Sequence, residues 1–165
     1  MAGTRGTDGS APDAEPRRRV TLYCDGACRG NPGVGGYGAI LLCDGHEKEL
    51  SGAVPMTTNN QMELMAAIVG LEALTEPCKV DIFTDSQYLK NGITVWIHAW
   101  RARGWRTADK KVVRNRELWE RLLELCTRHE LEWHWVPGHS GDLLNERCDE
   151  LANMAIERFI AEKAH

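Results

Sequence analysis

The sequence of 165 residues has no long hydrophobic run. No apolar segment of 15 residues follows its first residue, and nothing in it resembles a membrane span or a secretion signal. The six cysteines also lack the spacing of a structural zinc site, because no two of them form a Cys-x-x-Cys pair. We therefore expect a soluble protein of the reducing cytoplasm with free thiols.

The chain also lacks an excess of positive charge, since its formal net charge is -4. Any contact with nucleic acid should therefore be confined to a local patch. Such a patch lies at residues 101–116, where seven Lys and Arg against one acid, Asp109, give a local charge of +6. Trp96, Trp100 and Trp105 lie beside or within it, and aromatic faces among cations favour contacts with sugars and bases. The patch predicts a polyanionic partner.

One domain is expected, because a chain of 165 residues with 42% hydrophobic content suffices for one core but not for two. Residues 1–18 are rich in Gly, Ala, Pro and Asp and show no hydrophobic periodicity, which predicts a disordered N-terminal tail. The domain would then span residues 19–160, with residues 161–165 as a short C-terminal tail.

Hydrophobic periodicity divides this domain into a regular order of strands and helices. Strands are expected at residues 20–25, 37–43, 46–53, 79–84 and 131–136, with a Gly-rich turn through Gly36 and a hairpin turn at Asp44-Gly45. Helices are expected from an N-cap at Asn59 or Asn60 to residue 74, as short segments over 85–103, at 116–129, and from 143 past 156. The order predicts an α/β fold whose mixed sheet is antiparallel first and parallel across the helical crossovers.

Four acids stand in apolar surroundings, where an unpaired carboxylate is costly to bury. Glu63 is the single charged residue over positions 50–71, Asp25 and Asp85 each close an apolar strand, and Asp149 lies within a helix. Ligands gather at the carboxyl ends of such strands, and carboxylate oxygens suit a hard cation such as Mg²⁺. Each acid alone could instead cap a helix or a strand end. Together the four predict a metal site and an enzyme.

Two glycine-containing motifs lead to different predictions, one of a catalytic histidine and one of a structural role. His139 lies between Gly138 and Gly141 on a loop after a strand, within ten residues of Asp149, where an imidazole could shuttle a proton; the alternative is an ordinary surface histidine. Residues 33–38 match a dinucleotide fingerprint, but a strand-like run follows instead of a helix. Those glycines therefore indicate a turn and close packing rather than nucleotide binding.

Five segments, in this order, resemble bacterial ribonuclease HI, the type 1 RNase H family. They are residues 23–33 around Asp25, 57–67 around Glu63, 84–88 around Asp85, 135–141 around His139 and 145–152 around Asp149. The resemblance covers about residues 20–158 and includes the Trp-rich basic segment. It implies a ribonuclease H-like fold, with a five-stranded mixed sheet flanked by helices.

The resemblance also implies an activity. The chain would be a metal-dependent, sequence-independent endoribonuclease that cuts the RNA strand of RNA/DNA hybrids and leaves 5′-phosphate and 3′-hydroxyl ends. Two Mg²⁺ ions, with Mn²⁺ as a substitute, would be held by Asp25, Glu63, Asp85 and Asp149. His139 would assist proton transfer or product release, and the chain would act as a monomer.

The family's substrate contacts carry over by position. Four positions would face the minor groove of the RNA strand and contact its 2′-hydroxyls: Cys28, Asn31, Asn59 and Gln87. A DNA phosphate would be bound by Thr58 and Asn115, and a deoxyribose would pack on Trp96. The basic handle would comprise Trp100, Arg101, Trp105, Arg106, Lys111 and Arg114. Two positions depart from the family pattern. Ala27 replaces a frequent serine, and Ala102 replaces one of the paired cations of the handle.

Two alternatives remain open on the residues alone. The same fold could serve a DNA substrate, as in junction resolvases or integrase-type strand transferases. The chain could also be a non-catalytic hybrid-binding module, although such a module should have lost at least one of the four acids.

Overall fold

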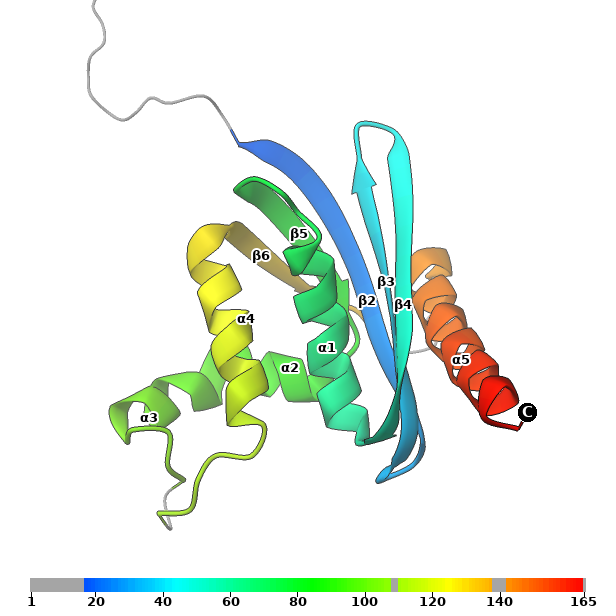
Figure 1. The fold of residues 1–165 in the computed structure, drawn as a ribbon. Helices are drawn as coiled ribbons and strands as arrows, with labels where there is room; N and C mark the ends of the chain where they lie inside the picture. The colour runs from blue at the N-terminus through cyan, green and yellow to red at the C-terminus, as the bar shows by residue number, and fades with distance from the viewer. Residues whose placement is uncertain (1–16, 108–109, 138–141, 165) are drawn as a thin grey trace, which may run out of the picture.

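A computed structural model of the chain describes residues 17–107, 110–137 and 142–164. Its centre is a five-stranded sheet in the order β4-β3-β2-β5-β6 (Figure 1). The strands are β2 (Arg18–Gly30), β3 (Gly33–Cys43), β4 (His46–Thr57), β5 (Cys78–Thr84) and β6 (Glu130–Trp135). The β2–β3 and β3–β4 pairs are antiparallel, whereas β2–β5 and β5–β6 are parallel. The mixed sheet expected from the sequence is therefore confirmed.

Helices cover both faces of this sheet. They are α1 (Asn59–Glu72), α2 (Gln87–Asn91), the π-helical turn η1 (Gly92–Trp96), α3 (Ile97–Ala102), α4 (Arg116–Arg128) and α5 (Leu143–Lys163). Helices α1 and α4 pack together on one face, and α5 packs against β2, β3 and β4 on the other (Figure 1). None of the helices in the described part of the chain combines the length and apolar character that crossing a membrane requires.

The main core lies between the sheet and the α1–α4 pair. Along β2, Val20, Leu22 and Cys24 are buried while the residues between them are less so, as the two-residue period of a strand requires. They meet the buried apolar face of α1, which includes Leu64 and Ile68. This packing fixes the position of α1 against β2.

The glycine-rich segment is not a turn, which corrects the expectation from the sequence. Strand β2 continues to Gly30 and β3 begins at Gly33, so the connection is only two residues long. A Cβ at Gly36 or Gly38 would clash with backbone carbonyl oxygens of α5. These glycines therefore let α5 approach β3 closely, and the close-packing part of the expectation is confirmed.

Two helix boundaries differ from the expectation, and one predicted turn is confirmed. Thr58, rather than Asn59 or Asn60, caps α1, because its side-chain oxygen accepts a hydrogen bond of 3.2 Å from the Gln61 backbone N–H. Helix α5 continues to Lys163, past residue 160. The Asp44-Gly45 hairpin turn is confirmed, with φ of 52° and 80° at its two residues.

Candidate active site

Three of the four predicted acids meet at one end of the sheet. Asp25 lies in β2, Glu63 in the first part of α1, and Asp85 directly after β5. One carboxylate oxygen from each lies within 4.8 Å of the others. Because these residues come from three separate stretches of chain, only the fold brings them together.

Local sequence explains how β2 comes so close to α1. Gly26 follows Asp25, and a Cβ there would lie 2.5 Å from the Met62 carbonyl carbon and 2.6 Å from the Glu63 nitrogen. No side chain fits into that space. The backbones of Asp25 and Glu63 are therefore neighbours because position 26 has no side chain.

Ser86 connects the second and third acids. Its hydroxyl donates a 2.6 Å hydrogen bond to Oε1 of Glu63, and its oxygen accepts one of 3.0 Å from the Leu89 backbone N–H, which caps α2. The residue next to Asp85 thus orients the carboxylate of Glu63. This role was not predicted from the sequence, although a serine before a short helix is a common N-cap signal.

The acids oppose one another in the ion-free chain. Burial, followed by the charges of Asp85 and Asp149, raises the pKa of Asp25 to about 8, although the Gly26 backbone N–H donates to its Oδ1 at 2.9 Å. Burial is also the main cause that raises the pKa of Glu63, while the hydrogen bond from Ser86 acts in the opposite direction. A cation between these oxygens would remove the repulsion.

Asp149 approaches the group from α5, on the other side of the sheet. Its charge helps to raise the pKa of Asp25, but it is not within the 4.8 Å group. The Asn153 side-chain amide donates to the Asp149 backbone oxygen at 2.9 Å and to its Oδ1 at 3.3 Å. Asp149 thus borders the other three acids. His139 lies outside the described residues.

Three of the four residues predicted to face the minor groove lie where β2 turns into β3 beside the start of α1. The Asn59 backbone N–H donates to Oδ1 of Asn31 at 3.1 Å, which ties the turn to the helix. The Cys28 thiol donates to the Thr57 carbonyl oxygen at 3.4 Å. Gln87 is exposed at the first position of α2.

Asn115 lies in a polar network that the sequence did not predict. Its Oδ1 accepts from the Gln61 amide and its Nδ2 donates to the Tyr88 hydroxyl, both at 3.0 Å. Trp119 also donates to the Tyr88 hydroxyl at 3.0 Å. The sequence does contain a capping-box pattern, Thr58-x-x-Gln61, in which the glutamine side chain usually bonds back to the N-cap residue. Here the Gln61 amide nitrogen instead donates to Asn115. A surface pocket beside this network is lined by Gln61, Val112, Val113, Asn115, Arg116, Glu117 and Leu118.

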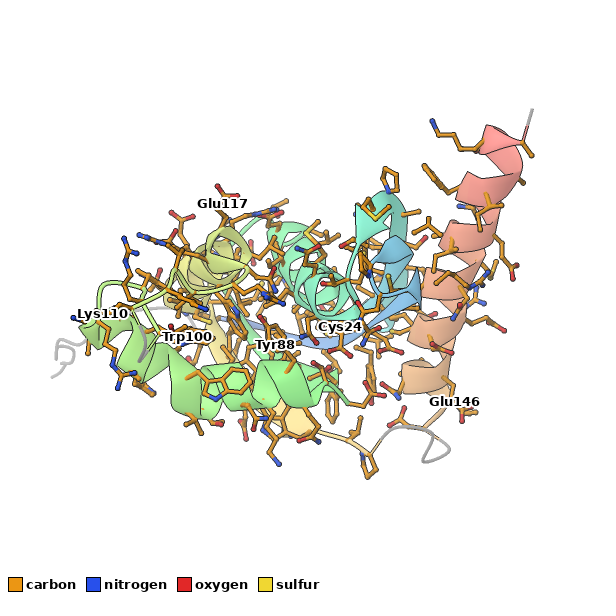
Figure 2. The ribbon with its side chains drawn as sticks, turned by 90° about the horizontal axis from the view of Figure 1, so that it is seen from below. Cys24, Tyr88, Trp100, Lys110, Glu117 and Glu146 are labelled. Carbon is orange, nitrogen blue, oxygen red and sulfur yellow. The ribbon has the colours of Figure 1, made fainter. Side chains whose placement is uncertain are left out.

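The tryptophans and cations of the predicted handle have different environments. Trp96, Trp100 and Trp105 are half-buried, and successive ring centroids lie 5.7 and 6.3 Å apart. Trp100 also meets the buried Trp119 at 5.6 Å. The basic side chains Arg101, Arg106, Lys111 and Arg114 are exposed. Figure 2 shows Tyr88, Trp100 and Lys110 along the α2–α3 side of the molecule, opposite Glu146 at the start of α5.

Comparisons with known proteins agree with this arrangement. The family model described as RNase H matches residues 17–157. Over 143 residues the chain is 57% identical to a ribonuclease H of Syntrophotalea carbinolica, which covers 87% of this chain and 94% of that protein. Over 137 residues it is 61% identical to a ribonuclease H of Bradyrhizobium diazoefficiens, covering 83% and 89%.

Solved structures show the same fold. LC9-RNase H1, described as a type 1 RNase H with the type 2 active-site motif, superposes with a TM-score of 0.78 at 31% identity, over 88% of this chain and 75% of that one. LC11-RNase H1, solved in complex with an RNA/DNA hybrid, superposes with a TM-score of 0.64 at 25% identity, over 86% and 99%. The chain therefore belongs to the RNase H family and is an endoribonuclease.

Proposed function

We propose that this chain hydrolyses the RNA strand of RNA/DNA hybrids, independently of base order, and leaves 5′-phosphate and 3′-hydroxyl ends. The observation that carries the proposal is the meeting of Asp25, Glu63 and Asp85 within 4.8 Å. The hybrid bound to LC11-RNase H1 supports the substrate class.

The acids fit a pair of divalent ions. Their donors are all carboxylate oxygens, the ligands that Mg²⁺ prefers. Burial first, and then the charges of neighbouring acids, raise the pKa of Asp25 and of Glu63, and a bound cation would oppose both effects. In the proposal, Asp25, Glu63, Asp85 and Asp149 hold two Mg²⁺, for which Mn²⁺ can substitute. When bound, the ions supply Lewis-acid activation of water and stabilise the departing 3′ oxygen.

The protein's own groups orient this site. Ser86 fixes one oxygen of Glu63, the Gly26 N–H fixes one oxygen of Asp25, and Asn153 contacts Asp149. Such hydrogen bonds hold ligands in place before a metal arrives. His139 would transfer a proton or assist product release, a role predicted from the sequence and family resemblance alone.

Among the residues that the structure describes, the polar contacts leave donors free for a nucleic acid. An amide nitrogen has two hydrogens, so Asn115 retains one N–H after donating to Tyr88. Thr58 uses its hydroxyl oxygen as a cap acceptor and keeps its O–H for a phosphate oxygen. We assign these two residues to a DNA phosphate, and Cys28, Asn31, Asn59 and Gln87 to the RNA minor groove.

The remaining contacts would come from the handle. Trp96 would pack on a deoxyribose, and the exposed cations of the Trp100–Arg114 segment would neutralise backbone phosphates. The proposal includes a monomeric chain acting in the cytoplasm. Size-exclusion chromatography with light scattering tests the first part, and a dimer would contradict it.

A cleavage assay tests the proposal directly. Labelled RNA/DNA hybrid, double-stranded RNA, single-stranded RNA and DNA are incubated with Mg²⁺ or with a chelator. We expect cleavage of the RNA strand of the hybrid, only with the metal, and its loss in Asp25→Asn. Asp44→Asn is the matched control, because Asp44 is an exposed acid in the β3–β4 hairpin turn.

Other outcomes would replace the proposal. Cleavage of DNA that contains no ribonucleotide would indicate a resolvase or strand-transferase activity. Tight hybrid binding without cleavage in either metal would indicate a binding module. Mapping the product ends by ligation tests the 5′-phosphate, and 3′-phosphate ends would contradict the two-metal mechanism.

A further inference from the structure

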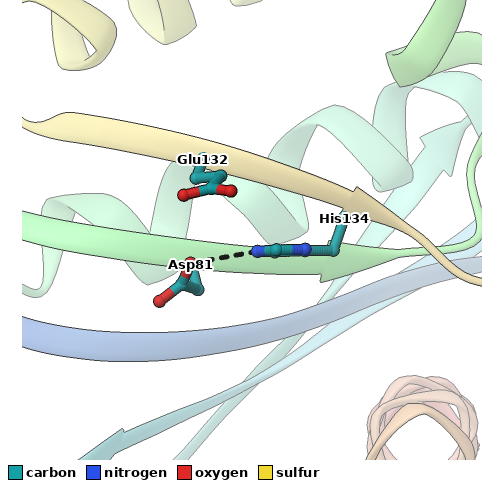
Figure 3. A group of neighbouring side chains, drawn as sticks. All are labelled: Asp81, Glu132 and His134. Atoms are coloured by element: carbon teal, nitrogen blue, oxygen red, sulfur yellow. Dashed lines mark hydrogen bonds and ion pairs between the residues drawn. The ribbon is translucent and has the colours of Figure 1, made fainter.

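A second group of metal-binding side chains lies on the outer side of β5 and β6, away from α1. Asp81 comes from β5, and Glu132 and His134 come from β6. One ligand atom from each lies within 4.8 Å of the others. Figure 3 shows the three side chains pointing toward one another, with His134 Nε2 and Asp81 Oδ1 3.0 Å apart.

The group is held in place by its neighbours. The His134 ring stacks on Phe83 with centroids 4.5 Å apart, and Phe83 stacks on Tyr23 at 4.7 Å. The Arg19 guanidinium lies 3.4 Å from the other carboxylate oxygen of Asp81. The imidazole and one carboxylate are therefore oriented before any ligand arrives, as metal ligands usually are.

The charge of Glu132 in this group is not balanced. Asp81 and Glu132 are direct partners in the parallel β5–β6 register, an arrangement in which like charges repel. Within the described part of the chain, the Glu132 carboxylate has no hydrogen bond or ion pair. The neighbouring cations face other acids, because Arg19 contacts Asp81 and Lys79 contacts Glu130 at 3.8 Å. A cation beside Glu132 would complete the cluster.

We propose that Asp81, Glu132 and His134 bind one divalent transition-metal ion of the Mn²⁺ or Zn²⁺ class. Adjacent ligands of an octahedral ion with bonds of about 2.1 Å lie about 3 Å apart. The 3.0 Å between His134 Nε2 and Asp81 Oδ1 already has this spacing, and the ion would displace to solvent the proton that this hydrogen bond holds. Water would fill the remaining coordination positions, since the group lies at the surface.

The imidazole gives the site a selectivity that the active site lacks. Zn²⁺ readily takes histidine nitrogen as a ligand and Mn²⁺ accepts it beside carboxylates, whereas Mg²⁺ prefers oxygen ligands alone. Millimolar Mg²⁺ would therefore compete poorly at this group while filling the all-carboxylate site. The bound ion would join β6, an edge strand, to β5 and so stabilise that edge of the sheet.

Mn²⁺ binding, followed by the electron paramagnetic resonance signal of the free ion, tests the proposal in the full chain. Excess Mg²⁺ is added to occupy the all-carboxylate site. We expect one Mn²⁺ to remain bound to the unmodified protein, and its affinity to fall at least tenfold in both Glu132→Gln and His134→Ala. Glu130→Gln is the matched control, because it removes an acid from the same face of β6 outside the group.

The outcomes are separable. Equal Mn²⁺ binding by the unmodified protein, Glu132→Gln and His134→Ala would overturn the proposal, and so would the absence of any Mn²⁺ that resists Mg²⁺. Glu132 is exposed, so its variant tests the site even if His134→Ala perturbs the ring stack. As a second measurement, Mn²⁺ should broaden the His134 imidazole resonances in the unmodified protein but much less in Glu132→Gln.

Discussion

The described part of the chain contains two three-residue groups with the same spacing and different surroundings. Asp25, Glu63 and Asp85 come from three elements and are buried or half-buried, whereas the Asp81 group comes from two paired strands and includes the exposed Glu132. Burial raises the pKa of Asp25, but the hydrogen bond from His134 lowers the pKa of Asp81. Spacing alone therefore does not define a site. The surroundings decide whether a carboxylate is strained or already compensated.

The largest expected difference between the groups is in catalysis. Asp25→Asn should lower the turnover of RNA/DNA hybrid by at least about 10³-fold, because losing a ligand charge removes several kcal/mol of transition-state stabilisation. Hybrid binding, measured by fluorescence anisotropy, should be largely kept, since the basic handle is unchanged. Equal losses of turnover in Asp25→Asn and Glu132→Gln would erase the distinction between the two groups.

The next difference concerns stability against pH without metal. The folded pKa of Asp25, about 8, lies above its unfolded value near 4, so the folded state binds the extra proton between these pH values. The free energy of unfolding should therefore fall as pH rises from about 4 to 8, by on the order of a few kcal/mol. The pKa of Asp81 is lowered in the folded chain, so its contribution to the free energy of unfolding is present above about pH 4 and is lost as pH falls below that value.

Urea unfolding followed by circular dichroism in chelator, repeated at several pH values, measures this slope. Asp25→Asn should flatten it, and Mg²⁺ should flatten it in the unmodified chain. A slope that is identical in both proteins would show that Asp25 carries no excess proton in the folded state.

Ser86→Ala probes the hydrogen bond that supports the buried group. The change removes the donor to Glu63 and the α2 cap, so we expect a loss of about 1 kcal/mol in stability and roughly tenfold in Mg²⁺ affinity. Isothermal titration with Mg²⁺ measures the second effect. Ser86→Thr keeps the hydroxyl and should retain most of the stability and of the Mg²⁺ affinity. If Ser86→Thr lost Mg²⁺ affinity as Ser86→Ala does, the hydroxyl would not act by orienting Glu63.

Glu132→Gln gives the smallest effect. It removes a like charge opposite Asp81, so without metal the free energy of unfolding should rise by about 0.2–1 kcal/mol. With Mn²⁺ and excess Mg²⁺ present, the order should reverse, because only the unmodified chain gains the bound ion. Thermal unfolding of both proteins, with and without Mn²⁺, measures these two differences in stability. If Glu132→Gln remained the more stable protein in Mn²⁺, the proposed site would be contradicted.

Much of the fold followed from the sequence because its strands alternate clearly. Val20, Leu22 and Cys24 predicted the buried side of β2, and the element order predicted the mixed sheet. The glycine-rich segment was misread because glycine serves both turns and close packing. Only the position of α5 shows which of the two applies to Gly36 and Gly38.

The candidate site was predictable to a similar degree. Acids that close apolar strands indicated where Asp25 and Asp85 would meet. Their supporting contacts were not predictable, because Gln61 and Asn115 lie 54 positions apart in sequence and Ser86 lies 23 from Glu63. The Asp81 group was missed for the same reason, since it depends on the register of β6 against β5.

Gly26 has a consequence for the choice of ion. The separation of Asp25 and Glu63 depends on how closely β2 approaches α1. Gly26 permits this approach because it has no Cβ atom. In the proposed metal site, the backbone would therefore help to select the ionic radius. A Gly26→Ala change would move the Asp25 and Glu63 carboxylates apart and favour larger ions, although all four acids would remain in the sequence.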